Sequence, residues 1–170
     1  MQFATPRFTS ALLCQQWKEE TASLYQNRKV MRLIGEPLSE KESEVVASTF
    51  IEANKRPWPA QKVWSITCNQ TQAFCGIQML CKSVLQDTAE IGIILAPSMN
   101  GKGAAREAMG ALVEFGLENL NLHQIVAQFE KRHLATKRLV TQLNFKQSKD
   151  SRFQPSKTNL VTYKMLLTKI

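Results

Sequence analysis

The chain has 170 residues, of which 44% are hydrophobic and 21% charged, and its formal net charge is +8. This length and composition are typical of a globular protein with a buried core, and we expect residues 1–170 to form one domain. No stretch approaches the roughly 20 apolar residues of a membrane-spanning helix, and the N-terminus lacks the basic start and apolar run of a secretory signal. The positive charge favours an anionic partner, a class that includes nucleic acids, anionic membranes and nucleotide cofactors.

The four cysteines predict neither a metal site nor a disulfide framework. They form no CxxC pair, and the sequence has no paired histidines. A chain of this size does not depend on disulfides for its core. We therefore expect reduced thiols, no bound metal and a cytoplasmic location.

The N-terminal part predicts a short strand followed by helices. Residues 3–9 fit a strand at a sheet edge or a strand end, because Pro6 cannot donate to a ladder. Residues 15–33 look helical in one or two pieces. Ser39 and Glu42 form an S-x-x-E capping box at the start of a further helix, which ends before the prolines that follow it.

The middle of the chain changes to strand patterns. Residues 63–68 and 74–83 flank a polar turn and predict an antiparallel hairpin. Residues 89–97 are almost continuously apolar, which is typical of a strand covered on both faces. An amphipathic helix over residues 102–120 and a strand over residues 123–130 follow, so the two strands should be parallel.

The C-terminal part completes a mixed α/β pattern. We expect a short helix over residues 134–143 and strands over residues 145–148 and 160–167.

The turn between the apolar strand and the long helix carries the main functional signal. It reads SMNGKGAA over residues 98–105. Gly101 and Gly103 leave backbone N–H groups uncovered at a helix N-terminus, where they and the helix dipole can bind a phosphate. The two glycines alone are more often a plain tight turn. No GxxxxGK[ST] loop is present, and Arg106 stands where a dinucleotide fingerprint would need its third glycine.

Residues 85–146 resemble the acetyl-CoA-binding core of the GNAT superfamily of N-acetyltransferases. The order AEIGIILAPSMNGKGAAREAMGALVEFGLENLNLHQIVAQFEKRHLATKRLVTQLNF is similar to an E-I-G strand, a [QR]-x-x-G-x-[GA] turn, an E-A helix, a strand and an N-x-A-S-x-R-L…L-G-F helix. The resemblance is closest to the branch of ribosomal-protein N-acetyltransferases, which also has a T-x-R motif, here Thr5-Pro6-Arg7. It implies a GNAT-like α/β domain with a mixed, mostly antiparallel sheet of about six to seven strands, a splayed parallel pair and about four helices.

Several positions depart from the family pattern. Ser98 replaces a glutamine or arginine, His133 replaces an asparagine, and Thr136 replaces a serine. Asn144 replaces a glycine but tolerates a left-handed helix end. Val140 lies where many relatives have a tyrosine.

The resemblance implies that acetyl-CoA is the cosubstrate. A bulge in the strand would expose backbone groups to the pantetheine arm, and the strands that carry Ile94 and Val126 would splay apart. A neutral His133 would take over the contact of the usual asparagine. The implied cofactor-binding residues are Ile93, Ile94, Leu95, Asn100, Gly101, Lys102, Gly103, Ala104, Ala105 and His133.

The implied catalytic residues are Glu90 and Thr136. Glu90 matches the glutamate of the E-I-G strand and would take the amine proton through a water, with a solvated strand-end carboxylate as the alternative. An N–H freed near Ile93 would stabilise the oxyanion. Thr136 could donate to the leaving thiolate, although a helix cap is the favoured interpretation. Glu107, in the first helical turn, is expected to be structural.

The favoured function is direct transfer of the acetyl group of acetyl-CoA to a primary amine. A protein N-terminus is the favoured acceptor, and lysine side chains, polyamines and small antibiotics stay open. Val140 and His133 motivate an alternative, a non-catalytic acyl-CoA-binding or regulatory module. A basic RNA- or ribosome-binding protein is a weaker alternative, since no RNA-binding motif is visible. We expect no DNA and no membrane partner, and the sequence leaves monomer and dimer open.

Overall fold

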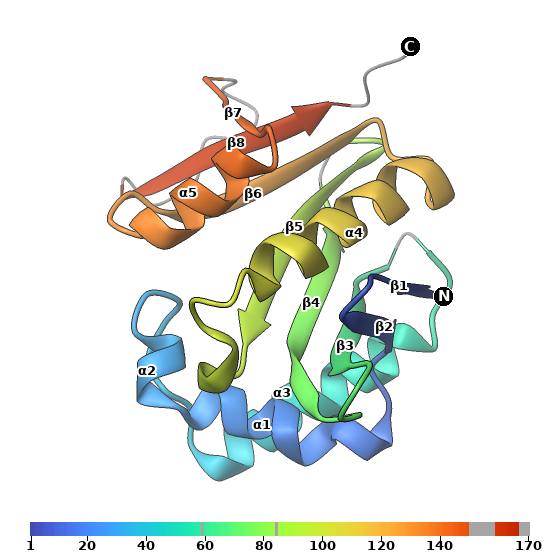
Figure 1. Cartoon of the computed structure of the whole chain (residues 1–170), viewed down its shortest axis with the longest axis vertical. Helices are drawn as coiled ribbons and strands as arrows, with labels where there is room; N and C mark the ends of the chain where they lie inside the picture. The colour runs from blue at the N-terminus through green and yellow to red at the C-terminus, as the bar shows by residue number, and fades with distance from the viewer. Residues whose placement is uncertain (59, 84, 150–158, 167–170) are drawn as a thin grey trace.

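The computed structural model describes residues 1–58, 60–83, 85–149 and 159–166. Its strands form a single eight-stranded sheet in the order β1-β2-β3-β4-β5-β6-β8-β7 (Figure 1). Every neighbouring pair is antiparallel except β5 and β6, which are parallel. The strands are β1 (Gln2–Ala4), β2 (Phe8–Leu12), β3 (Lys62–Cys68), β4 (Phe74–Lys82), β5 (Thr88–Leu95), β6 (Gln124–Glu130), β7 (Lys146–Gln147) and β8 (Leu160–Leu166). The mixed, mostly antiparallel sheet with one parallel pair is confirmed.

The sheet has more strands than the sequence predicts because the N-terminal segment is a hairpin. The expectation of one strand over residues 3–9 is wrong: β1 and β2 pair with each other, and Pro6 lies in the turn between them. Thr5 donates its N–H to the carbonyl of Phe8 across this turn, at 2.7 Å. Pro6 therefore sits where the ladder needs no donor.

The helices follow the predicted order. They are η1 (Gln15–Trp17), α1 (Lys18–Gln26), α2 (Arg28–Met31), α3 (Glu40–Asn54), η2 (Pro97–Met99), α4 (Ala104–Asn119) and α5 (Leu134–Gln142). The capping box of α3 is confirmed, because Ser39 Oγ accepts from Glu42 N–H at 3.3 Å and Glu42 Oε2 accepts from Ser39 N–H at 2.9 Å. Asn27 separates α1 from α2, and its Oδ1 accepts from Lys29 N–H at 3.0 Å. Among the described residues, no helix is both long enough and apolar enough to cross a bilayer.

Two layers of helices cover the two faces of the sheet (Figure 1). On one face, α4 and α5 bury a cluster that includes Leu80, Ile91 and Leu112. On the other, α1 and α3 pack over a cluster that includes Ile77 and Ile94. Each fully buried aliphatic side chain contributes about 1.5–3 kcal/mol to stability. Because neighbouring β5 residues alternate between these layers, the strand is covered on both faces, as its apolar sequence predicts.

The parallel pair β5 and β6 diverges along its length. The strands pair only at Thr88↔Gln124, Ala89↔Ile125 and Glu90↔Val126. Beyond these positions β5 continues to Leu95 and β6 to Glu130, but the two strands no longer pair with each other. Figure 1 shows them moving apart toward α2. The predicted splay of the strands that carry Ile94 and Val126 is confirmed. Ile94 lies in the part of β5 that has separated from β6, and Val126 lies at the last paired position of β6.

Candidate functional site

The first component of the site is the edge of β5 that faces β6, which is unpaired after Glu90. The opposite edge of β5 pairs with β4 without a register shift, from Lys82↔Ala89 to Gly76↔Leu95. The expected bulge near Ile93 is therefore absent from this ladder. Backbone groups facing β6 become available for another reason: β6 turns away after Glu90.

Gly76 holds the end of β5 close to β4, and sequence reasoning missed it. Its φ is +148°, and a Cβ at this position would lie 2.3 Å from the carbonyl oxygen of Ile94. No side chain fits there, so the close approach of the two strands requires glycine. A single glycine within an apolar strand was the available signal.

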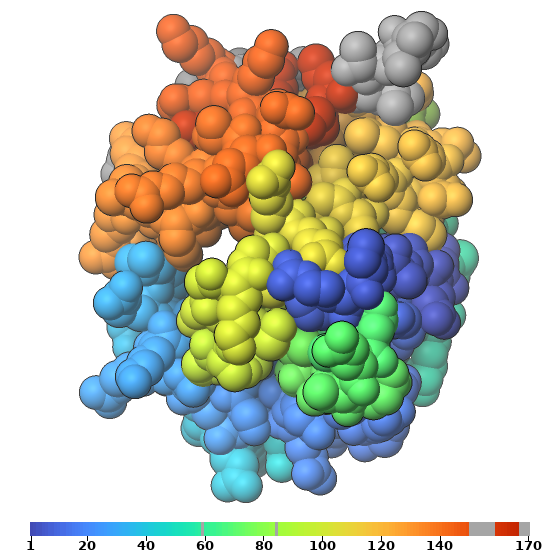
Figure 2. All heavy atoms as spheres, viewed as in Figure 1, coloured from blue at the N-terminus to red at the C-terminus, as the bar shows by residue number. Residues whose placement is uncertain are grey.

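A cavity of about 280 Å³ lies beside the unpaired end of β5 and is also lined by residues of α2, of the turn before α4 and of α5. Figure 2 shows the hollow between α2, the turn before α4 and the region of α5. It brings together these predicted site residues: Ile93, Ile94, Leu95, Asn100, Ala105, His133 and Thr136. Glu90, Gly101, Lys102, Gly103 and Ala104 do not line it. A hollow of about 520 Å³ over α1 and α3 contains none of the predicted site residues.

The glycine turn lies beside this cavity and leads into α4. Gly101 and Gly103 have φ values of +75° and +70°, in the left-handed region that favours glycine. Gly103 is the N-cap residue of α4 and supplies no side-chain cap, so the first N–H groups of the helix have no intrahelical partner. Ala104 is 2% exposed and keeps the first turn small.

These features fit coenzyme A. The cavity offers apolar side chains and an open strand edge to a pantetheine arm, and the turn offers backbone N–H groups at a helix N-terminus to a pyrophosphate. Within the described part of the chain, no three His, Cys, Asp or Glu side chains come together as metal ligands would.

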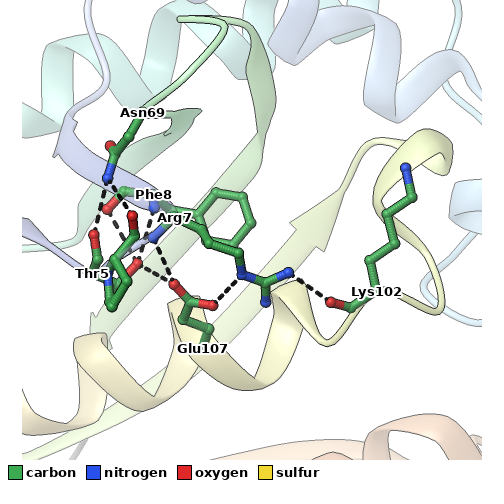
Figure 3. A network of polar contacts seen from close by, with 7 residues as sticks. Thr5, Arg7, Phe8, Asn69, Lys102 and Glu107 are labelled. Carbon is green, nitrogen blue, oxygen red and sulfur yellow. Dashed lines mark hydrogen bonds and ion pairs between the residues drawn. The ribbon is translucent and has the colours of Figure 1, made fainter.

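Thr5, Arg7 and Glu107 form a polar network behind the glycine turn (Figure 3). Glu107 Oε1 accepts from Thr5 Oγ1 at 2.6 Å and from Arg7 N–H at 3.0 Å, and Oε2 accepts from Arg7 Nε at 2.6 Å. Arg7 also donates from Nη1 to the carbonyl of Lys102 at 2.9 Å. Although burial raises the pKa of Glu107, the hydrogen bonds from Thr5 and Arg7 hold it below its usual value. Glu107 thus has the structural environment expected of it, and the T-x-R motif supplies its partners.

Glu90 lies at the last paired position of β5 with β6, where the strands begin to separate. It is half-buried, and burial raises its pKa. Its pairing partner on β4 is Cys81, whose thiol pKa is raised to about 11 by burial and by the charge of Glu90. Burial and then Cys81 also raise the pKa of Tyr25 on α1. A carboxylate with a raised pKa accepts a proton more readily than an exposed one.

His133 is the N-cap residue of α5 and also lines the cavity. Its Nδ1 accepts from the N–H of Thr136 at 3.3 Å. An accepting Nδ1 carries no proton, which places the proton of the neutral ring on Nε2. Burial lowers the pKa of His133 and favours this neutral form.

Thr136 has a different place from the one expected. The cap of α5 comes from the side chain of His133, and Thr136 contributes only its backbone N–H to it. Its side chain lines the cavity, where a hydroxyl can donate to a ligand.

No tyrosine lines the cavity. Val140, at the position of the usual tyrosine, is 0% exposed and belongs to the core under α4 and α5. Of the two tyrosines, Tyr163 stacks on Phe129 in the same core and Tyr25 packs against Phe50.

Lys29 and Arg32 line the cavity from α2 and the segment after it, and sequence reasoning did not assign them to the site. In the described ranges, no carboxylate lies within ion-pair distance of either side chain. The cluster of basic residues at positions 28–32 was the available signal, but the sequence did not show which of them faces a cavity.

Comparison with known proteins agrees with this geometry. The family model of the acetyltransferase (GNAT) domain matches residues 13–146. The uncharacterized N-acetyltransferase YnaD of Bacillus subtilis is 27% identical over 117 residues, which are 69% of this chain and 66% of the relative, just under two thirds of its length.

Solved structures share the fold. Spermidine N-acetyltransferase from Vibrio cholerae, in complex with CoA and spermine, has a TM-score of 0.78 and 22% identity, covering 95% of this chain and 96% of its own. RimL, a ribosomal L7/L12 alpha-N-protein acetyltransferase in complex with coenzyme A, has a TM-score of 0.80 and 15% identity, covering 98% of each chain. Because the family model matches more than half of the residues, this chain belongs to the GNAT family, whose enzymes are acetyl-CoA-dependent acetyltransferases.

Proposed function

We propose that this protein transfers the acetyl group of acetyl-CoA directly to a primary amine. The observation that supports this most strongly is the divergence of β5 and β6 after Glu90, with a cavity and the glycine turn at the open end. Acetyl-CoA would supply the activated acetyl group as a thioester. Ile93, Ile94 and Leu95 would hold the pantetheine arm, and the turn from Asn100 to Ala105 would hold the pyrophosphate.

The chain's own groups meet the needs of the reaction. Glu90 would take the proton of the attacking amine through a water, since burial raises its pKa toward the working range of a base. A backbone N–H on the open edge of β5 would donate to the oxyanion. The Thr136 hydroxyl would donate to the leaving thiolate, in place of a tyrosine.

The charge of the cavity favours a protein N-terminus over a polyamine as acceptor. Among the residues that the structure describes, its charged lining residues are Lys29 and Arg32, and none is a carboxylate. A polyamine carries several positive charges and would be repelled there, whereas a peptide presents one amine. An α-amine, with a reference pKa near 8, also loses its proton more easily than a lysine with a pKa near 10.4.

Two measurements test the proposal. Calorimetry with acetyl-CoA comes first, and thiol release is then measured with a panel of peptides, lysine analogues, spermidine and aminoglycosides. We expect binding of acetyl-CoA and the fastest release with a peptide N-terminus. Absence of binding would contradict the proposal, and faster turnover of spermidine would contradict the choice of acceptor.

The second candidate is an acyl-CoA-binding or regulatory module without turnover, favoured by the absence of a tyrosine from the cavity lining. It requires tight binding of acetyl-CoA with no thiol release on any amine. Salt-sensitive RNA retention without acetyl-CoA binding would instead support an RNA-binding protein.

For either CoA-dependent function we propose that residues 1–170 form a single domain and that the protein lies in the cytoplasm. The cytoplasm is a reducing compartment, which suits the free cysteines Cys14, Cys68, Cys75 and Cys81.

A further inference from the structure

Arg7 connects the N-terminal hairpin to the glycine turn across a wide sequence separation. Its guanidinium bridges two groups, the carboxylate of Glu107 in the first turn of α4 and the carbonyl of Lys102 between the two glycines. Figure 3 shows the Arg7 side chain lying between these acceptors, while the Lys102 side chain points away from the network. Arg7 does not line the cavity.

Arg7 is itself held in place by its surroundings. Its guanidinium lies 5.1 Å from the ring centroid of Phe8, which is 2% exposed. The backbone N–H of Asn69 donates to the carbonyl of Arg7 at 2.9 Å, and its Nδ2 donates to the carbonyl of Thr5 at 2.9 Å. The turn of the hairpin is thereby tied to Asn69, directly after β3, and these bonds hold the backbone from which the Arg7 side chain reaches α4.

The contact with the Lys102 carbonyl sets the direction of the next N–H. In a trans peptide the C=O and the following N–H point in opposite directions. With the Lys102 oxygen turned toward Arg7, the N–H of Gly103 points away from Arg7. A segment with two positive-φ glycines has many alternative conformations, and ordering it when a ligand binds costs free energy.

We propose that Arg7 is a positioning residue for the cofactor: together with Glu107 it orders the glycine turn so that its N–H groups are aimed at the pyrophosphate. Arg7 acts from behind the turn and does not touch the ligand. The inference rests on the proposed function, since it assumes that the turn binds the pyrophosphate of coenzyme A.

Three probes separate positioning from direct contact: coenzyme A, 3′-dephospho-coenzyme A and pantetheine, each titrated against the full chain. We expect Arg7→Ala to weaken coenzyme A and dephospho-coenzyme A equally, by about tenfold, because ordering the turn now costs binding free energy. Pantetheine lacks the pyrophosphate, and its affinity should not change. A loss confined to coenzyme A would overturn the proposal, because it would mean that Arg7 binds the 3′-phosphate.

Glu107→Ala distinguishes the proposal from a simple effect of charge. Removing a carboxylate near an anionic ligand should raise affinity if only charge matters. Positioning predicts the opposite, a loss similar to that of Arg7→Ala, and a double variant no weaker than either single one because the two residues act as a unit. Increased affinity of Glu107→Ala would overturn the proposal.

Two further variants provide the controls. Arg7→Lys keeps the charge but cannot bridge both acceptors, so its loss of coenzyme A affinity should be nearly as large as that of Arg7→Ala. If Arg7→Ala fails to fold, Arg7→Lys takes its place in the test. Lys55→Ala breaks an exposed ion pair with Glu52 at the end of α3 and should change nothing. If the wild type does not bind coenzyme A, the proposed function fails. If the wild type binds and Arg7→Ala and Arg7→Lys bind equally well, only this inference fails.

Discussion

Glu90 lies at the point where β5 and β6 separate, in an environment that raises the pKa of its carboxyl group. Glu90 is half-buried beside Cys81, and burial raises its pKa. Because the folded state binds the proton more tightly than the unfolded state, the free energy of unfolding falls as pH rises from the ordinary glutamate pKa through the raised one. The same raised pKa makes the carboxylate a better base near neutral pH.

We therefore expect Glu90→Gln to lower turnover by at least about tenfold with little change in acetyl-CoA affinity. Glutamine keeps the shape of the side chain but cannot take the amine proton. The variant should also lose the fall in stability over the pH window just described. Thiol-release kinetics and calorimetry check the first point, and thermal unfolding at several pH values checks the second.

The control for this variant is Glu114→Gln, which changes an exposed carboxylate of α4. Turnover equal to the wild type in Glu90→Gln at neutral pH would show that Glu90 is not the base.

His133 joins a structural role to a place in the cavity. Its folded-state pKa is lowered, so protons bind the unfolded state first and the N-cap of α5 weakens as pH falls below about 6.5. Asparagine is a good N-cap residue without a titrating ring. We expect His133→Asn to retain or improve acetyl-CoA affinity and to remove any loss of affinity as pH falls below about 6.5.

Calorimetric titration of both forms at neutral pH and at pH values below about 6.5 checks this prediction, with His123→Asn as the matched control. His123 is exposed and pairs with Asp87, 3.4 Å away, outside the cavity. Identical pH profiles for the wild type and His133→Asn would mean that His133 does not contact the cofactor.

At the scale of elements, the strand–turn–helix segment from β5 to α4 is the part that binds anions in the proposed mechanism. Gly103→Val should weaken acetyl-CoA binding at least about tenfold, or about 1.4 kcal/mol. A β-branched residue resists the positive φ of +70° and covers the neighbouring N–H groups.

Gly110→Ala, within α4, is the control for a change of glycine on the same helix. Its added Cβ would lie 3.3 Å from Cδ2 of Leu143, the end of a flexible side chain. A folded Gly103→Val with unchanged affinity would remove the turn from the cofactor site.

At the scale of the whole molecule, the sheet consists of two parts that share a short seam. The β1–β5 part and the β6–β8 part pair only at Thr88↔Gln124, Ala89↔Ile125 and Glu90↔Val126, and α4 packs across both. A ligand in the gap contacts residues of both parts, so it binds the folded chain and not the unfolded one.

Coenzyme A at about 100 times its Kd should therefore raise the free energy of unfolding by about 2.7 kcal/mol. The change is measured as the shift of Tm with ligand concentration, and pantetheine at equal multiples of its own Kd should give the same stabilisation. A Tm independent of coenzyme A at these concentrations would contradict binding to the folded state.

The order of elements and the glycine turn were predictable from the sequence because they depend on local patterns. An almost continuous apolar run predicted β5, and apolar periodicity predicted α4. The Ser39–Glu42 capping box marked the start of α3, and Asn144 has the positive φ expected at the end of α5. Each of these features is decided by residues within one or two turns of each other.

The composition of the site was decided by the tertiary structure. Arg7 meets Glu107 and Lys102 only because the N-terminal hairpin reaches the start of α4, and Lys29 and Arg32 face the cavity only because α2 lies at the open end of β5. The loss of pairing beyond Glu90 depends on how β6 packs, which no pattern within β5 reveals. Contacts between residues so distant in the sequence leave no periodicity or spacing to read, because they arise from the packing of whole elements.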